Sequence, residues 1–283
     1  MNKTINDIED VLLMGPGPSC IHDSVYAALS SKTLGHMDPY FIRIMDETKE
    51  FLQKVMQTQN RLTLPISGTG SAGMEACFVN LIEKDDPVLI LINGVFGMRM
   101  QDLAGRLGAR VDTLEFEWGK PVDLNLVEDK LKTNSYKILA LVHAETSTGV
   151  RNPGEEVGEM LRGEDTLYIL DAVTSLGGIE VAADDWGVDA LYSGSQKCLS
   201  CPPGLAPATF SVSLRRFSRI TSFDTPVYFL CSSSSMIFKS YNNKSTLSVM
   251  LSKSSKEAYP EVSTATLILF FLISKRRVSK KLG

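Results

Sequence analysis

The feature that most constrains the fold is an alternation of short apolar segments with helix-like segments between residues 39 and 193. Strand-like apolar runs occur at residues 62–66, 88–92, 110–114, 137–143, 166–171 and 190–193. Helical spacing of apolar residues occurs at 39–57, 69–82, 96–107, 123–132 and 155–161, with Asp123 placed to cap its helix. Apolar strands separated by helices predict an α/β fold, in which a mostly parallel sheet carries helices on both faces.

The segments that directly follow these strands are rich in Gly, Ser, Thr and Asn. They are residues 67–73, 93–97, 144–149, 171–175 and 193–197. In a parallel sheet such segments gather at one edge, where ligands bind. Small polar residues at that edge, together with Asp171 and Lys197, predict a site for an anionic ligand that carries a ring.

Residues 67–73, Ser-Gly-Thr-Gly-Ser-Ala-Gly, follow a strand and begin a helix. Small residues let the backbone approach a ligand, and free N–H groups at a helix N-terminus bind phosphate. The spacing of Gly68, Gly70 and Gly73 also matches the dinucleotide pattern G-x-G-x-x-G, which requires an acid at the end of the next strand. The strand at 88–92 ends without an acid, so the sequence favours a phosphate loop over an NAD site. A tight structural turn is the alternative.

Asp171 and Lys197 each follow an apolar strand, where a charged side chain is partly withdrawn from water. An Asp in this place can simply cap the next segment, and most lysines are solvated surface charges. Lys197, however, precedes the rigid Pro202-Pro203-Gly204 turn, and a desolvated lysine can bond covalently to a carbonyl. Pyridoxal phosphate needs a lysine, an acid opposite its pyridine nitrogen and a phosphate cup. The three features on one sheet edge therefore predict pyridoxal phosphate as the cofactor.

Composition argues against several other classes of protein. The formal net charge of −4 argues against a general nucleic-acid binder, and the longest apolar run, 267–273, is too short for a membrane span. Five cysteines make no disulfide framework and no signal-peptide pattern is found, so we expect a reducing, cytoplasmic compartment. Cys198 and Cys201 form a C-x-x-C without further ligands nearby, so no metal is expected.

Charge and composition change near residue 210. Residues 1–210 carry a formal charge of −13 and 20 of the 21 glycines, whereas residues 211–283 carry +9 and include 17 serines. We therefore expect an incomplete large domain in residues 1–210 and a divergent Ser-, Lys- and Arg-rich tail in residues 211–283 that is not a native domain. A basic arm for a membrane or a nucleic acid is the alternative for this tail.

Six stretches of the chain occur in the order and spacing of one known family. They are residues 13–19, 67–76, 93–97, 143–150, 171–178 and 192–197. In these stretches the chain resembles the class V aminotransferases of fold type I, most closely the alanine–glyoxylate/serine–pyruvate aminotransferase group. The resemblance implies a large domain that binds pyridoxal phosphate, with the family's C-terminal small domain missing or replaced after residue 210.

The resemblance also implies roles for individual residues. Lys197 would bind the cofactor covalently and serve as general base and acid, and Asp171 would hold the pyridine nitrogen. Backbone N–H groups of Gly70, Ser71 and Ala72 would surround the phosphate.

The remaining implied contacts come from four loops and the N-terminal motif. Gln196 would reach the phosphate side, Phe96 would stack on the cofactor ring, and Val173 would pack on the other face of the ring. Thr146 would lie near the cofactor hydroxyl and Gly15 near the substrate carboxylate.

The implied function is transfer of the amino group of alanine or serine to glyoxylate or pyruvate, by a homodimer without nucleic-acid or membrane partners. One alternative is a truncated, inactive homologue, because the family's substrate-binding arginine is not found in residues 211–283. Another is a cysteine desulfurase or selenocysteine lyase, which usually has a histidine where this chain has Phe96. Relatives can be peroxisomal through a C-terminal signal, but Lys281-Leu282-Gly283 does not match one.

Overall fold

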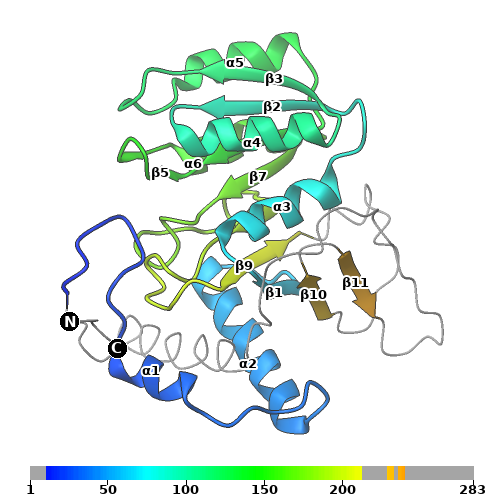
Figure 1. Cartoon of the computed structure of the whole chain (residues 1–283). Helices are drawn as coiled ribbons and strands as arrows, with labels where there is room; N and C mark the ends of the chain where they lie inside the picture. The colour runs from blue at the N-terminus through cyan, green and yellow to red at the C-terminus, as the bar shows by residue number, and fades with distance from the viewer. Residues whose placement is uncertain (1–10, 212–227, 233–234, 240–283) are drawn as a thin grey trace.

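A seven-stranded β-sheet forms the centre of the computed structural model, which describes residues 11–211, 228–232 and 235–239. The strand order is β1-β9-β8-β7-β4-β2-β3. The strands are β1 (Leu62–Ser67), β2 (Pro87–Ile92), β3 (Arg110–Glu115), β4 (Ile138–Val142), β7 (Leu167–Asp171), β8 (Ala190–Tyr192) and β9 (Leu205–Phe210). Only β9 runs against the other strands of this sheet, so the predicted mostly parallel sheet is confirmed (Figure 1).

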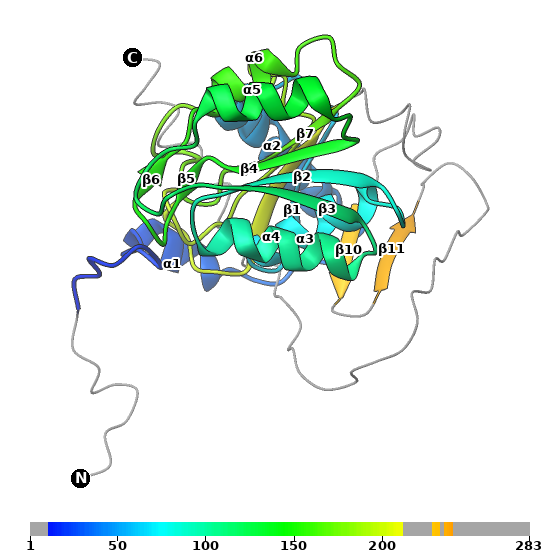
Figure 2. The same ribbon diagram turned by 90° about the horizontal axis from the view of Figure 1, so that it is seen from above.

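Helices cover both faces of the sheet, as the alternation in the sequence predicts (Figure 2). One face carries α3 (Gly70–Leu81) and α4 (Val95–Arg106), and the other carries α2 (Pro39–Met56), α5 (Leu124–Thr133) and α6 (Gly154–Met160). The short helix α1 (Asp23–Leu29) packs with the second group. Each face has its own hydrophobic core cluster, so the sheet is buried on both sides.

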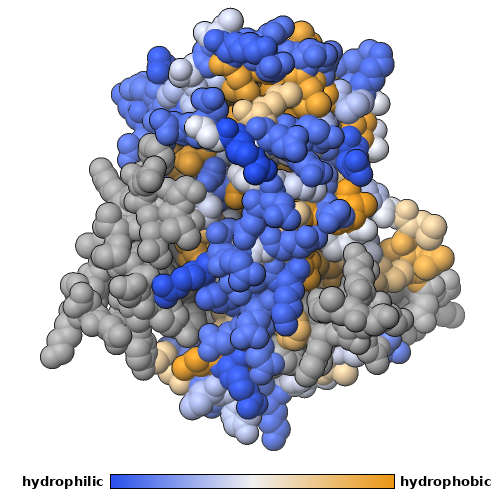
Figure 3. All heavy atoms as spheres, turned by 180° about the vertical axis from the view of Figure 1, so that it is seen from behind, coloured by the Kyte–Doolittle hydropathy of each residue, from blue (hydrophilic) through white to orange (hydrophobic). Residues whose placement is uncertain are grey.

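Local sequence explains where the helices begin and which side they bury. Asp38 and Asp123 cap α2 and α5 by accepting hydrogen bonds from the backbone N–H groups of Tyr40 and Asn125, which confirms the predicted cap at Asp123. The buried residues of α2 are Thr48, Leu52 and Met56, which lie four residues apart on one helix face. The outer surface on this side of the molecule is mostly hydrophilic (Figure 3).

Strand β9 is the largest departure from the sequence-based prediction, which leaves residues 205–210 unassigned. Pro207 interrupts the run and Ala206 and Ala208 have weak strand preference, so the segment lacks a strand pattern. The missing N–H of Pro207 points to the same side as its carbonyl, which accepts a hydrogen bond from Ser193 N at 2.8 Å just past the end of β8, so the sheet loses one bond there. On its other side Pro207 lies opposite Pro65 of β1.

Two small antiparallel pairs complete the described structure. Strands β5 (Ala144–Glu145) and β6 (Val150–Arg151) form a hairpin after β4, and β10 (Tyr228–Ser232) pairs with β11 (Ser235–Lys239). The rest of the expected tail lies outside the described residues, so the division near residue 210 stays a prediction. No helix in the described part of the chain is both long and apolar enough to cross a membrane.

Candidate active site

Apart from Gly15, the predicted site residues lie at one edge of the sheet, at the end of a strand, on the loop after it or in the first turn of the next helix. Because β1, β2, β4, β7 and β8 run in the same direction, their carboxyl ends meet there. The loops after these strands bring together the segments that the sequence singled out. Backbone bonds join neighbouring loops, as where His143 N donates to Asp171 O at 2.9 Å.

Asp171 ends β7, and its side chain is buried with 3% of its surface exposed. One carboxylate oxygen accepts a hydrogen bond from Val173 N at 2.8 Å, and the other accepts one from the Tyr192 hydroxyl at 2.8 Å. Burial raises the pKa of the Asp171 carboxyl to about 6, although these two hydrogen bonds oppose the rise. The carboxyl is therefore held in a fixed orientation, in a place where a cationic partner would stabilise its charge.

Lys197 lies on the loop that joins β8 to the antiparallel strand β9. Its half-buried side chain reaches the N-terminal segment, where the ammonium donates a hydrogen bond to Pro16 O at 2.9 Å. Gly17 packs so closely that an added Cβ would lie 2.5 Å from Lys197 Cδ. Ser19 fastens the same segment through its hydroxyl, which donates to Lys197 O at 3.2 Å. Residues 15–18, Gly-Pro-Gly-Pro, therefore lie directly against the lysine.

The N-terminus of α3 lies at the same edge and can accept a phosphate. Thr69, the N-cap residue, makes no side-chain hydrogen bond to this terminus. Ala72 N donates to Thr69 O at 2.8 Å, so the amides of Gly70 and Ser71 are the better placed donors for an anion. A side chain at position 70 would crowd Val173, because a Cβ on Gly70 would lie 2.9 Å from Val173 Cγ2.

Gln196 places a polar group in this region. Its Oε1 is buried and has no hydrogen-bond partner among the described residues, and a Cβ on Gly194 would lie 2.8 Å from it. A buried polar atom without a partner is costly, which fits a site completed by a polar ligand.

Phe96 and Val173 both pack, partly buried, against the core cluster beneath α3 and α4. Thr146 is half-buried, and its hydroxyl forms a 2.5 Å hydrogen bond with the Thr174 hydroxyl, which links the loops after β4 and β7. Gly15 is exposed and an added Cβ there would contact nothing within 4 Å. In this segment it is the neighbouring Pro16 whose carbonyl accepts the hydrogen bond from the Lys197 ammonium.

These residues fit pyridoxal phosphate. A buried acid, a lysine, an uncapped helix N-terminus and a cradle that a Cβ at Gly70 would fill lie at one edge of the sheet. Close contacts at Gly194 and Gly70 bring Val173 together with Gln196 and with the start of α3. Phe96 is held separately, through its backbone N–H to Glu145.

Sequence analysis missed three residues that contact the predicted site. Tyr192 donates to Asp171, Pro16 accepts from Lys197, and Glu145 accepts from Phe96 N at 3.1 Å. Glu145 and Tyr192 lie within the stretches that carry the family resemblance. An acid inside a loop of Gly, Ser and Thr at the ligand edge is the signal that could have singled out Glu145.

Comparisons with known proteins identify the family of this chain. The model of the family described as aminotransferase class-V matches residues 21–221. The (S)-ureidoglycine–glyoxylate transaminase of Bacillus subtilis is 45% identical over 199 residues, which are 70% of this chain and 48% of that protein. The alanine–glyoxylate aminotransferase of Rattus norvegicus is 41% identical over 224 residues, which are 77% of this chain and 54% of that protein.

A solved structure shows the same fold. The alanine–glyoxylate aminotransferase from Nostoc sp. superimposes with a TM-score of 0.81 and 36% identity, covering 99% of this chain and 71% of that one. This likeness confirms the expected fold, that of the pyridoxal-phosphate-dependent transferases of fold type I. The chain spans about half the length of the curated relatives it matches. Because the family model covers most of the chain and the predicted cofactor residues meet at one sheet edge, this chain belongs to the class V aminotransferases.

Proposed function

We propose that this chain is the cofactor-binding part of a pyridoxal-phosphate-dependent transaminase, which moves the amino group of alanine or serine to glyoxylate or pyruvate. One observation carries the proposal. Asp171, which is buried and accepts two hydrogen bonds, ends β7, and Lys197 lies on the loop after the neighbouring strand β8. The uncapped terminus of α3 at the same sheet edge supports it.

Each of these groups has a task in such a reaction. When bound, pyridoxal phosphate supplies an electron sink for the carbanion at the substrate Cα. Asp171 would face the pyridine nitrogen and keep it protonated, and the amides of Gly70 and Ser71 would hold the phosphate. Lys197 would hold the cofactor through its side-chain amine and would serve as the general base and acid at the substrate Cα.

Glyoxylate is the best supported amino acceptor. Both relatives described above are named for glyoxylate, while their amino donors differ. We therefore keep alanine or serine as the proposed donor and treat ureidoglycine as a second donor to be tested.

We also propose that the protein acts as a homodimer in the cytoplasm, without a nucleic-acid or membrane partner. Support for the compartment comes from the cysteines of the described part of the chain, among which no disulfide forms. Support for the dimer comes from the family resemblance, and sedimentation of the full chain tests it.

The first test is the visible absorption spectrum of the purified full chain after addition of pyridoxal phosphate. We expect a lysine-dependent band that disappears with alanine and returns with glyoxylate, that is absent from Lys197→Ala, and that is kept in Lys132→Ala on the exposed side of α5. A band that no amino acid changes would contradict transamination and favour an inactive homologue. Release of sulfide from cysteine would favour the desulfurase, and no band would overturn the proposal.

A further inference from the structure

Glu145 is a buried acidic side chain that contacts the predicted site but has no part in the proposed reaction. Only 1% of its surface is exposed, which is rare for a glutamate unless its charge is compensated. It lies on β5, directly before Thr146, and two residues separate it from the end of the buried strand β4.

The Glu145 carboxylate accepts four hydrogen bonds, two at each oxygen. Oε1 accepts from Ser147 N at 3.1 Å and from Ser147 Oγ at 2.7 Å. Oε2 accepts from Phe96 N at 3.1 Å and, more weakly, from Gly97 N at 3.4 Å. Because the donors are backbone amides and one hydroxyl, the carboxylate is satisfied without a cationic side chain.

These bonds cap α4 from outside that helix. Its own N-cap residue, Gly94, has no side chain, and Val95 N donates to Ser147 Oγ at 2.9 Å. The first amides of α4 are thus held by the loop after β4, and a carboxylate at this end also opposes the helix dipole. Gly94 leaves room for the cap, since a Cβ there would lie 2.3 Å from Glu145 Cγ.

Two residues with predicted cofactor contacts are held by the same carboxylate. Phe96 donates its backbone N–H to Glu145, and Thr146 is the next residue in the chain, inside the turn that Glu145 forms with Ser147. We propose that Glu145 is a positioning residue, which fixes the Phe96 ring and the Thr146 hydroxyl relative to each other so that the cofactor ring enters a preformed slot. The inference rests on the proposed function.

The same carboxylate also acts on Asp171 through space, and its charge is among the causes that raise the Asp171 pKa. Replacing Glu145 by a neutral residue therefore changes the protonation of Asp171 as well as the position of Phe96. A test must separate these two effects, and the apo protein and a double variant with Phe96 do so.

The first experiment measures amide hydrogen exchange in the apo full chain. In Glu145→Gln and Glu145→Ala we expect the peptide that contains Phe96 and Gly97 to exchange about tenfold faster, as loss of a helix cap implies. The matched control is Glu155→Gln, which removes an exposed acid from the first turn of α6. Unchanged exchange in both Glu145 variants would overturn the proposal, whatever the cofactor does.

The second experiment titrates pyridoxal phosphate into the same variants. We expect affinity to fall about tenfold in Glu145→Ala, less in Glu145→Gln, which keeps one acceptor oxygen, and not at all in Glu155→Gln. In a protein that already carries Phe96→Leu, Glu145→Gln should lower the cofactor affinity only slightly further, because the ring that Glu145 positions is gone. Equal losses with and without Phe96 would overturn positioning through that ring.

The proposed function fails in a different way. If the wild-type chain shows no cofactor band, transamination by this chain is overturned, and the exchange experiment still decides whether Glu145 holds α4. Faster exchange together with undiminished cofactor affinity would also overturn the inference, since the cap would then serve the fold alone.

Discussion

Asp171 shows at the scale of one residue how a functional group weakens the fold that carries it. The carboxyl is buried, and its pKa is raised from 3.8 to about 6. The folded state therefore binds this proton more tightly than the unfolded state does. Stability from this group is highest at low pH and falls as the pH rises from about 4 to about 6.

Asp171→Asn should stabilise the apo protein at pH 8 by about 2 kcal/mol, because the amide carries no charge to bury. The gain should shrink toward pH 5, where the wild-type carboxyl binds its proton. Thermal unfolding of both proteins at pH 5, 6 and 8 measures this. In the presence of pyridoxal phosphate the order should reverse, since the charged Asp171 then has a cationic partner. A stabilisation that does not vary with pH would contradict the assigned cause.

Tyr192→Phe should raise the pKa of Asp171 above its present value, because it removes a hydrogen bond that favours the charged form. We expect transamination to slow about tenfold, the equivalent of one buried hydrogen bond to a charged group, with a smaller change in the KM for alanine. The rate should also rise at higher pH than in the wild type.

Tyr168→Phe is the matched control for this substitution. Tyr168 is equally buried, but its hydroxyl donates to Gly154 O at 2.9 Å, on the α6 side of the sheet. Loss of stability without a shifted pH profile is expected there, and the same shift in both variants would contradict a specific role for Tyr192.

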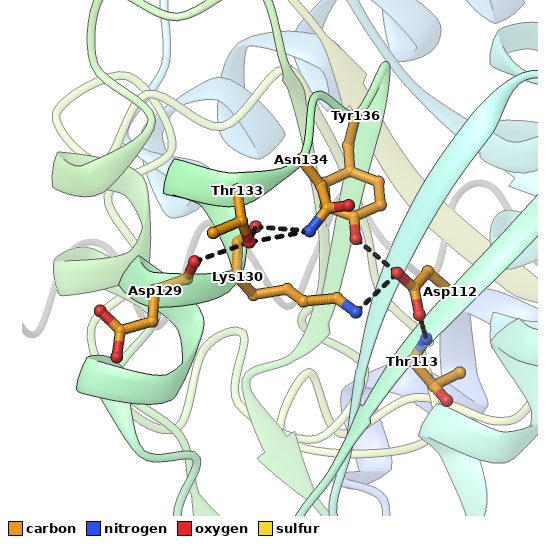
Figure 4. A network of polar contacts seen from close by, with 7 residues as sticks. All are labelled: Asp112, Thr113, Asp129, Lys130, Thr133, Asn134 and Tyr136. Atoms are coloured by element: carbon orange, nitrogen blue, oxygen red, sulfur yellow. Dashed lines mark hydrogen bonds and ion pairs between the residues drawn. The ribbon is translucent and has the colours of Figure 1, made fainter.

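At the scale of the elements, the far end of the sheet is held by a polar network around Asp112 of the edge strand β3. Lys130 of α5 donates to the Asp112 carboxylate at 2.7 Å, and Tyr136, which precedes β4, donates to it at 2.5 Å (Figure 4). The network joins a strand, a helix and a loop, and the charge on β3 also discourages pairing with another chain.

Asp112→Asn should lower the free energy of unfolding at pH 7 by about 1 kcal/mol, a small value because this side chain is 40% exposed. The hydrogen bond from Lys130 is the main cause that lowers the Asp112 pKa. The stability that the Asp112 carboxylate contributes is present above the ordinary pKa of an aspartate and is lost as the pH falls through the lowered pKa of Asp112. Urea unfolding at pH 7 and pH 4 checks this. Asp102→Asn, in an exposed pair with Arg106, should have a smaller effect.

The elements also show what sequence alone can predict. Parallel strands such as β2, β4 and β7 were predictable because burial on both faces makes them continuous apolar runs. Strand β9 was not, because Pro207 and its alanines give it no strand pattern, and its place in the sheet depends on pairing with β1, about 140 residues earlier in the chain. The ligand edge follows from the strand order, but whether an acid such as Glu145 is buried depends on the tertiary contacts of α4.

At the scale of the molecule, the described residues hold the whole predicted cofactor-binding edge. The family match and the described sheet both cover this region, while the expected tail falls mainly on residues outside the description. A chain with this edge can be tested for cofactor binding separately from turnover, which is why the spectrum precedes any assay of amino transfer.

The place of β9 has a consequence for how the protein is made. Its partner β1 carries α3, whose N-terminus is proposed to bind the phosphate, and in the described sheet β1 pairs with β9 alone. While the ribosome is still adding the residues in between, β1 has no strand to pair with, and such non-local pairing is slow. We therefore expect the N-terminus of α3 and Gln196, the two predicted phosphate contacts, to come together only after residues 205–210 have been made.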